Sequence, residues 1–171
     1  MRSAPRIKPQ HQSRQPGRES VMEPQPENTM EHYQAAGKLK GKKAIVTGGD
    51  SGIGRSVAIG FAKEGADVAI FYLEENEDAE FTRRHVEREG RRCLLIRGDI
   101  GDAELMGSLL ARHRPATVLN FAAESHVDRS IHGPADFITK NVVGTSRLLE
   151  ACRGYYDGLD ATEKAAFRFL P

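Results

Sequence analysis

The chain has 171 residues, 39% of them hydrophobic, and a formal net charge of +1, which allows one ordinary domain and little more. The near-zero charge gives no reason to expect nucleic acid or a membrane surface as the main partner. Its two cysteines are too few for a disulfide framework or a metal site, and no apolar run is long enough to span a bilayer.

Residues 1–36 are rich in Pro, Gln, Arg, Glu and His and show no sustained helical or strand period. Such a segment buries too little apolar surface to offset its ordering entropy. We therefore predict a disordered or loosely wrapped arm, followed by one domain over residues 37–171. The basic start of the arm lacks the apolar stretch of a secretory signal, so a cytoplasmic location is expected.

From Lys43 onward, short apolar strands alternate with amphipathic helices. Strands are predicted at 43–47, 67–73, 92–100, 116–123 and 167–171, with helices ending at Gly65 and covering about 78–90, 103–115 and 135–153. The apolar side chains predicted to face the core are Ile53, Val57, Ala58, Phe61, Ala62, Phe81, Val86, Leu105, Leu109, Leu110, Phe137, Ile138, Val142, Leu148 and Leu149.

Strict βαβα alternation with short connections favours a parallel sheet covered on both faces. Right-handed crossovers then leave a doubly wound, Rossmann-like α/β fold as the predicted topology. With about five strands the sheet is predicted to be incomplete, with an open apolar edge beside the last strand. We therefore expect the C-terminal part to be weakly held or to need a partner chain, for which a homo-oligomer is one candidate.

The turn TGGDSGIGR lies between the first strand and the first helix, the context in which a glycine motif indicates nucleotide binding. Gly48 permits the tight turn, Gly52 lets backbone approach a pyrophosphate, and Gly54 lets the helix pack closely. The helix N-terminus offers N–H groups and partial positive charge to a phosphate. A tight strand–helix turn without a ligand is the alternative. The predicted cofactor contacts here are Gly48, Asp50, Ser51, Gly52, Ile53, Gly54 and Arg55.

The sequence leaves the choice between NAD and NADP open. An acidic residue at the end of the second strand usually meets the adenine ribose of NAD. Glu74 comes slightly late for this role, and Arg55 would favour a 2′-phosphate instead. Asp99 and Ile100, at the end of the third strand, are predicted to meet the adenine ring. A helix N-cap or turn residue is the alternative role for Asp99.

The spacing TGxxxGIG resembles that of the short-chain dehydrogenase/reductase superfamily. Residues of about 8–101 are similar to its compact oxidoreductases of the bacterial general-stress type, which carry the same Pro/Gln-rich arm. Residues of about 103–170, with the run AAESHVDRSI, are similar to the extended branch, above all to dTDP-glucose 4,6-dehydratase. The chain thus resembles a splice of two branches, joined near Gly101-Asp102.

This resemblance implies a nicotinamide site after the fourth strand. The compact branch has Asn-Asn-Ala-Gly there, and this chain matches its first Asn and its Ala. Asn141 matches the helix Asn of the family, and Lys140 stands where the dehydratases usually have Thr. Ser125 would also contact a sugar-nucleotide substrate. The residues implied to line the nicotinamide side of NAD or NADP are Asn120, Phe121, Ala122, Ala123, Glu124 and Ser125.

The residues that would catalyse a reaction in the superfamily are absent from this sequence. Short-chain dehydrogenases use a Tyr-x-x-x-Lys pair, in which the lysine lowers the pKa of the tyrosine. None of the four tyrosines has a lysine four residues later, and Tyr155 and Tyr156 fall in a segment similar to a dehydratase loop. No catalytic residue is therefore assigned. His126, Asp128 and Arg129 are interpreted as capping and ion-pairing residues of a loop.

Three functions follow as hypotheses. The first is a domain that binds the cofactor and catalyses no reaction. The second is an active NAD(P)-dependent oxidoreductase or dTDP-glucose 4,6-dehydratase relative. The third is a non-functional product of recombination or truncation. The absent Tyr-x-x-x-Lys pair favours the first for its chemistry and the third for its origin.

Overall fold

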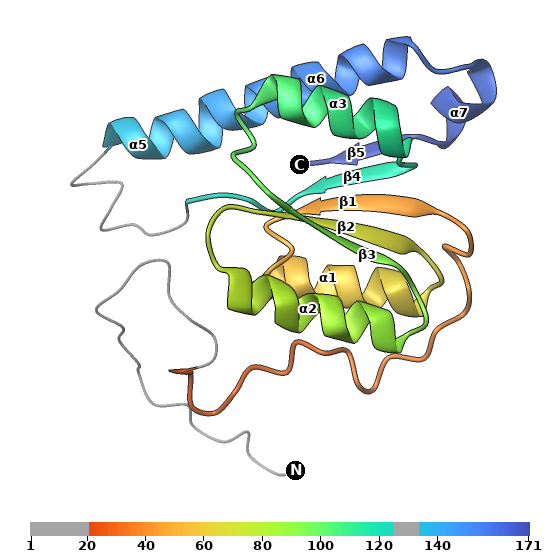
Figure 1. Cartoon of the computed structure of the whole chain (residues 1–171), viewed down its shortest axis with the longest axis vertical. Helices are drawn as coiled ribbons and strands as arrows, with labels where there is room; N and C mark the ends of the chain where they lie inside the picture. The colour runs from red at the N-terminus through yellow and green to blue at the C-terminus, as the bar shows by residue number, and fades with distance from the viewer. Residues whose placement is uncertain (1–20, 125–133) are drawn as a thin grey trace, which may run out of the picture.

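The computed structural model describes residues 21–124 and 134–171 of the chain (Figure 1). Strands and helices alternate along it, as the hydrophobic pattern predicts. In chain order the elements are β1 (Lys43–Thr47), α1 (Gly52–Lys63), β2 (Asp67–Tyr72), α2 (Asn76–Arg88), β3 (Cys93–Arg97), α3 (Ala103–His113), β4 (Thr117–Asn120), α5 (Pro134–Ile138), the π-helical segment η2 (Thr139–Gly144), α6 (Thr145–Asp157), α7 (Ala161–Ala166) and β5 (Arg168–Leu170).

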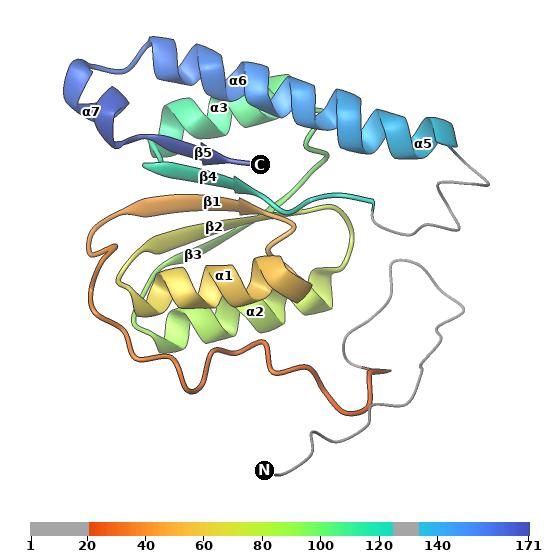
Figure 2. The ribbon, with the colours of Figure 1, turned by 180° about the vertical axis from the view of Figure 1, so that it is seen from behind.

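The five strands form one sheet in the order β3-β2-β1-β4-β5, and all neighbouring strands are parallel. Helices α1 and α2 cover one face, and α3 and α6 cover the other (Figures 1 and 2). The predicted Rossmann-like fold is thereby confirmed. The chain changes faces between β1 and β4, and doubly wound sheets bind ligands at the carboxyl ends of the strands where this switch occurs.

The core has two layers because successive side chains of a strand point to opposite faces. In β1, Ala44 and Val46 pack against α1 and α2, whereas Ile45 packs against α3 and α6. Both layers exclude solvent, since Ile45 and Val46 are each no more than 1% exposed. Five of the predicted core residues of the helices are buried: Ala58, Ala62, Val86, Leu110 and Leu148.

The long helix after β4 departs from its prediction. It continues through α5, η2 and α6 to Asp157, so Tyr155 and Tyr156 lie in its last turns and not in a loop. Ile138, Val142 and Leu149, predicted to face the core, are at least half exposed. The π-helical turn closes i→i+5 hydrogen bonds, which changes the angle between successive side chains. Apolar residues spaced at the ordinary α-helical period therefore do not all lie on the buried face of this helix.

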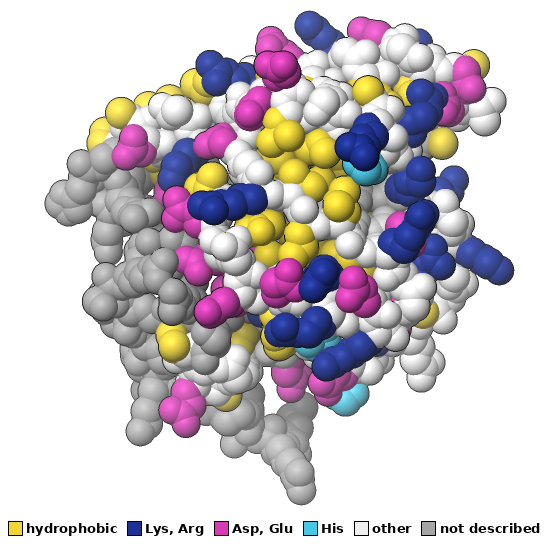
Figure 3. Space-filling view, in the orientation of Figure 1, with side chains coloured by type: hydrophobic (Ala, Val, Ile, Leu, Met, Phe, Trp, Pro, Cys, Tyr) yellow, Lys and Arg dark blue, Asp and Glu magenta, His cyan; other side chains and the backbone are white. Residues whose placement is uncertain are grey.

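The two edge strands expose apolar side chains. Leu94 of β3 is 41% exposed. Figure 3, which views the molecule from the side of β3, shows hydrophobic side chains gathered in the middle of this surface. At the other edge, β5 pairs with β4 over three residues, and its Leu170 is 48% exposed. Phe167, directly before β5, is buried in the core. An aromatic anchor thus precedes a short and half-exposed strand.

Residues 21–42 lie against α1 with little regular secondary structure. One of their contacts is with Glu64, which follows α1 and is 5% exposed. Its carboxylate accepts hydrogen bonds from the Tyr33 hydroxyl, from the Ala36 N–H at 3.2 Å and from the Lys38 N–H at 2.6 Å. One buried side chain therefore binds the arm between residues 33 and 38, in a segment whose composition alone predicts loose structure.

Replacing Glu64 by alanine is expected to release this part of the arm. The Tyr33 hydrogen bond, followed by that from Lys38, lowers the pKa of the Glu64 carboxyl. The stabilisation is therefore complete above the ordinary glutamate pKa and is lost as the pH falls through the lowered value. Hydrogen exchange should show fast exchange at the Ala36 and Lys38 amides in Glu64→Ala, and Tyr33→Phe should give an intermediate rate. Unchanged protection in Glu64→Ala would contradict this account.

Both cysteines behave as apolar residues. Cys152 is 2% exposed, and burial raises the pKa of the Cys93 and Cys152 thiols to about 12. Within the described ranges, each helix is too short or too polar to cross a membrane.

Candidate cofactor-binding site

The glycine turn closes tightly between β1 and α1. Gly48 and Gly52 have positive φ angles of 63° and 54°, a conformation that favours glycine. A Cβ atom at Gly48 would lie 2.9 Å from the Ala122 nitrogen. A Cβ atom at Gly54 would lie 2.0 Å from the Gly48 oxygen. Gly48 and Gly54 thus allow backbone to meet backbone, and Gly52 allows the positive φ angle at the start of α1.

Side-chain hydrogen bonds join the carboxyl ends of β1 and β4. The fully buried Thr47 donates from Oγ1 to Asn120 Oδ1 at 2.6 Å. Thr47 Oγ1 also accepts a hydrogen bond from the Ala122 N–H at 3.2 Å. The Phe121 N–H donates to the Thr47 carbonyl at 3.0 Å. The predicted phosphate turn and the predicted nicotinamide segment therefore meet at one edge of the sheet.

Asn141 fixes the end of the segment that follows β4. Its Oδ1 accepts from the Glu124 N–H, and its Nδ2 donates to the Glu124 carbonyl, both at 2.8 Å. The neighbouring Lys140 Nζ lies 3.8 Å from Glu124 Oε2. The helix asparagine singled out by resemblance is thus a positioning residue for the backbone at 121–124. Ser125, His126, Asp128 and Arg129 lie outside the described residues.

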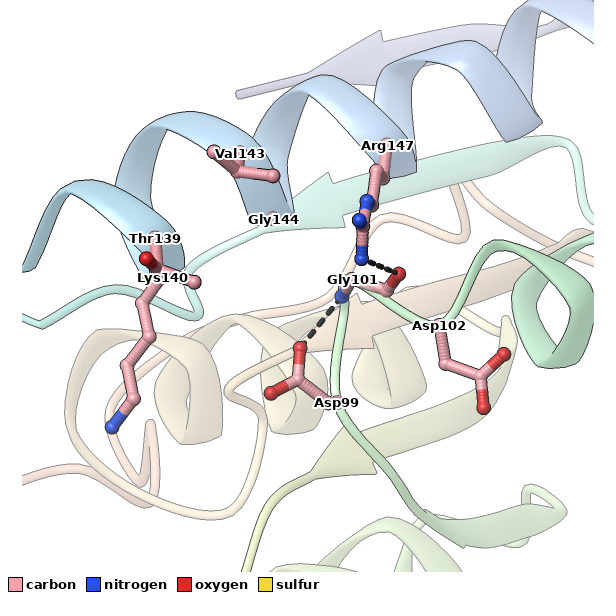
Figure 4. Close-up of a pocket in the computed structure, with 8 residues that line it drawn as sticks. All are labelled: Asp99, Gly101, Asp102, Thr139, Lys140, Val143, Gly144 and Arg147. Atoms are coloured by element: carbon pink, nitrogen blue, oxygen red, sulfur yellow. Dashed lines mark hydrogen bonds between the residues drawn. The ribbon is translucent and has the colours of Figure 1, made fainter. Parts of the chain in front are cut away.

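A cavity of about 310 Å³ opens between the β3–α3 connection and the long helix (Figure 4). This volume is near the lower end of ligand pockets, which start at about 300 Å³. Lys140 and Asp99 extend into the same space in Figure 4. The lining residues are Asp99, Gly101, Asp102, Thr139, Lys140, Val143, Gly144 and Arg147.

The two residues predicted to meet adenine have different surroundings. Asp99 lines the cavity and its Oδ1 accepts from the Gly101 N–H at 2.7 Å, so it also shapes the turn. The N-cap of α3 is Asp102, which accepts from the Leu105 N–H at 2.9 Å. Ile100 is 8% exposed and packs against Gly144, where an added Cβ would lie 3.1 Å from Ile100 Cγ1.

Sequence reasoning singled out Lys140 in the helical wall of this cavity and missed Val143 and Arg147. Lys140, Val143 and Arg147 follow one another at spacings of three and four residues, which is the signal of one helical face. The apolar residues of the same helix predict only its core-facing side, so this second face does not stand out in the sequence. Arg147 closes the cavity by donating from its guanidinium to the Gly101 carbonyl at 3.3 Å.

The Arg55 side chain lies between the glycine turn and α2. Its side chain is buried and makes an ion pair with Asp78 at 3.1 Å. The guanidinium also donates to the Asp50 carbonyl at 2.6 Å and to Thr82 Oγ1 at 3.0 Å, and it lies 4.7 Å from the centre of the Phe81 ring. Arg55 therefore anchors the glycine turn to α2.

The other residues of the turn differ in their surroundings. Ser51 occupies the N-cap position of α1, yet its side chain makes no capping hydrogen bond. Ile53, predicted to face the core, is 73% exposed. Burial raises the pKa of the Asp50 carboxyl, its own backbone N–H offsets part of this rise, and the negative charge of Asp78 adds to it.

Tyrosine hydroxyls make structural contacts. Tyr33 donates to Glu64, Tyr72 donates to Asn76 Oδ1 at 2.9 Å, and Tyr155 donates to the Pro115 carbonyl at 3.1 Å. Among the described residues, no three His, Cys, Asp or Glu side chains are grouped as metal ligands.

Known proteins resemble this chain in two segments. It is 55% identical over 128 residues to the uncharacterized oxidoreductase YhdF of Bacillus subtilis, covering 72% of this chain and 44% of YhdF. It is 60% identical over 77 residues to dTDP-glucose 4,6-dehydratase of Xanthomonas campestris, covering 45% of this chain and 22% of that enzyme. The two matched segments overlap, because their shares together exceed the chain. The chain spans less than half the length of either relative.

A solved structure and a family model also match this chain. UDP-glucose-4-epimerase from Stenotrophomonas maltophila, solved with bound NAD and formylated UDP-arabinopyranose, superimposes with a TM-score of 0.61 at 27% identity, over 67% of this chain and 34% of the epimerase. The model of the GDP-mannose 4,6 dehydratase family matches residues 45–170. The chain therefore belongs to the GDP-mannose 4,6 dehydratase family, within the short-chain dehydrogenase/reductase superfamily that its motifs resemble.

Proposed function

We propose that the chain binds a nicotinamide dinucleotide, NAD or NADP, at the joined carboxyl ends of β1 and β4. The observation that carries this proposal is the backbone contact between Gly48 and the 121–122 segment, where an added Cβ would lie 2.9 Å from Ala122 N. Such close packing brings the N-terminus of α1 to the crevice, and a helix N-terminus favours phosphate. The NAD named with the similar epimerase structure supports the same cofactor class.

In this proposal each predicted residue has a place. The turn at 48–55 takes the pyrophosphate, and the Ser51 hydroxyl, which caps no N–H of its own helix, adds a donor. The cavity at Asp99 takes the adenine ring, and the segment at 120–125 lines the nicotinamide ring. Arg55 acts as a positioning residue because its guanidinium donates to the Asp50 carbonyl and pairs with Asp78 of α2.

We also propose that the chain binds the cofactor without transforming it. The resemblance requires a Tyr-x-x-x-Lys pair, which the sequence lacks. Three tyrosine hydroxyls are held by Glu64, Asn76 and the Pro115 carbonyl. We also propose a cytoplasmic location, which rests on the sequence alone.

Titration of the full chain with NAD⁺ and NADH tests the binding function. NADH fluorescence and calorimetry should both report saturable binding, with a dissociation constant below about 1 mM. No change in absorbance at 340 nm is expected when polyols are added with NAD⁺. Absence of binding at millimolar cofactor would overturn the proposal. Absence of a cooperative unfolding transition as well would favour a non-functional product.

A sugar-nucleotide-dependent dehydratase is the second candidate. Its support is the 60% identity to dTDP-glucose 4,6-dehydratase over 77 residues. In this reading Ser125 contacts the sugar nucleotide. Incubation with dTDP-glucose and NAD⁺, followed by chromatography of the sugar nucleotide, distinguishes the two: the binding domain returns dTDP-glucose unchanged, whereas a dehydratase gives a 4-keto product.

Self-association is a further part of the proposal. Ile138, Val142 and Leu149 expose apolar side chains along the helix that follows β4. Exposed apolar side chains gathered on one element favour protein contacts. Analytical ultracentrifugation should show a concentration-dependent dimer, and a monomer at all concentrations would contradict it.

A further inference from the structure

Strand β3 lies at the edge of the sheet and turns backbone groups outward. Within the described ranges, β2 is the one strand that pairs with it. The Gly98 N–H, directly after β3, donates to the Tyr72 carbonyl of β2 at 2.9 Å. Because alternate residues of a strand direct their N–H and C=O groups to opposite sides, those of Cys93, Leu95 and Arg97 point away from β2. A further strand can therefore add to this edge.

The side chains of β3 leave an apolar surface open beside this edge. Leu94 is 41% exposed. Ile96, on the same face of the strand, is only partly buried against the core layer of α3 and α6. A Cβ atom at Gly98 would lie 2.7 Å from Leu105 Cδ2, which places Leu105 over the end of β3. The hydrophobic side chains gathered in Figure 3 lie on this side of the molecule.

β3 has few of the features with which proteins block the pairing of an edge strand. Such features are proline, lysine, bulges and very short strands. The sequence of β3, CLLIR, contains neither proline nor lysine, and its register with β2 is continuous over five residues. Its one charge is Arg97 at the end, whose Nε donates to the Leu73 carbonyl at 3.1 Å. The other edge strand, β5, has three residues, so β3 is the more open edge.

Two copies of β3 complement each other when they run antiparallel with Leu95 opposite Leu95. The outward N–H and C=O groups of the two strands then meet, with Cys93 opposite Arg97. Leu94 falls opposite Ile96 in a pair without hydrogen bonds, the kind in which side chains approach most closely. By symmetry this apolar pair occurs twice, on the face where Leu94 is exposed.

Charge selects this register over its neighbours. With Leu95 at the centre, Arg91 of one copy lies opposite Asp99 of the other, so that opposite charges meet. A centre at Leu94 would instead place Arg97 opposite Arg91, and like charges directly opposite each other are destabilising. A centre one residue after Leu95 would place Leu94 opposite Gly98 and lose the apolar pair. The strand is therefore complementary to itself in one register.

We propose that β3 pairs with β3 of a second copy of this chain, antiparallel about a two-fold axis at Leu95, so that the two sheets become one. The same surface serves both copies, as a two-fold interface requires. This interface lies on other elements than the exposed helical residues Ile138, Val142 and Leu149, and it does not rest on dinucleotide binding.

Hydrogen exchange of the full chain at several protein concentrations tests the pairing through its backbone pattern. The Cys93, Leu95 and Arg97 amides should gain protection as the dimer forms, because they point outward in the monomer. The Leu94 and Ile96 amides face β2 and should be protected at every concentration. Fast exchange at Leu95 in a sample that sedimentation shows to be dimeric would overturn the proposal. So would a monomer at all concentrations up to about 1 mM.

Lysine substitutions distinguish this interface from the helical surface. Val142→Lys charges the helix and should still dimerise through β3. Adding Leu94→Lys should raise the dissociation constant of the dimer about tenfold or more, because it puts a charge into both Leu94–Ile96 pairs. The matched control is Leu170→Lys, the same change on the other edge strand at a position 48% exposed. Added to Val142→Lys, it should leave the dissociation constant unchanged.

The possible outcomes separate the two surfaces. Circular dichroism verifies that each variant folds. A Val142→Lys variant that is monomeric at all concentrations would overturn the β3 interface and assign the association to the helix. Equal effects of Leu94→Lys and Leu170→Lys would also overturn it. Dimers that persist in Val142→Lys and dissociate on adding Leu94→Lys would support it.

Discussion

Gly54→Ala is expected to abolish dinucleotide binding and to lower the free energy of unfolding by about 3 kcal/mol. The added Cβ would lie 2.0 Å from the Gly48 oxygen and 2.7 Å from the Gly48 carbonyl carbon. Both contacts are with backbone, so no side chain can turn aside to relieve them. The glycine turn must move, and its contact with the 121–122 segment moves with it. Urea denaturation and NADH titration measure the two effects.

The matched control is Gly107→Ala in α3. Nothing lies within 4 Å of a Cβ atom at Gly107, and alanine is favoured over glycine within a helix by about 1 kcal/mol. This variant should be as stable as the unaltered chain or more stable, with unchanged NADH affinity. Normal NADH affinity in Gly54→Ala would show that the packing of the turn does not position the cofactor.

Arg55→Met is expected to lower the free energy of unfolding by about 3 kcal/mol. Methionine fills part of the space but leaves Asp78, which is 13% exposed, without its cation. Because the guanidinium also holds the Asp50 carbonyl, NADH affinity should fall as the turn loosens. In urea denaturation, an unchanged slope of the free energy of unfolding against urea concentration would assign the effect to the native state.

Two further variants separate the buried pair from a general effect of charge. Arg83→Met removes the Arg83–Glu80 ion pair within α2, whose two side chains are each 41% exposed. This change should alter the free energy of unfolding by no more than about 0.5 kcal/mol. Arg55→Met combined with Asp78→Leu removes both buried charges and should be more stable than Arg55→Met alone. An Arg55→Met variant as stable as Arg83→Met would contradict the anchoring role.

Much of the fold could be predicted because strand and helix periods differ. The apolar runs at β1 and β2 and the glycines between β1 and α1 predict the doubly wound topology, because right-handed crossovers leave few alternatives. Helix α7 was missed although a signal was present: Asp160 and Glu163 form a capping box around its first turn. The signal is weak because the helix has only six residues.

The close backbone contacts of the candidate site could be predicted from the sequence, whereas the directions of its side chains could not. Glycines in a turn between a strand and a helix indicate a close approach of backbone to backbone, which Gly48 and Gly54 make. An arginine reports only its charge, and the partner that decides its direction, here Asp78, lies 23 residues away. The exposure of Ile53 likewise depends on what covers the start of α1, which a helical period does not contain.

The most direct test of the account is an NMR titration of the full chain with NAD⁺. The account predicts that the largest amide shift changes fall at 48–55, at 99–101 and at 121–124, which together form the carboxyl edge of β1, β3 and β4. In Gly54→Ala these changes should disappear. Changes confined to the arm at 25–33, or to the opposite edge of the sheet, would show that the dinucleotide does not bind at the switch between β1 and β4.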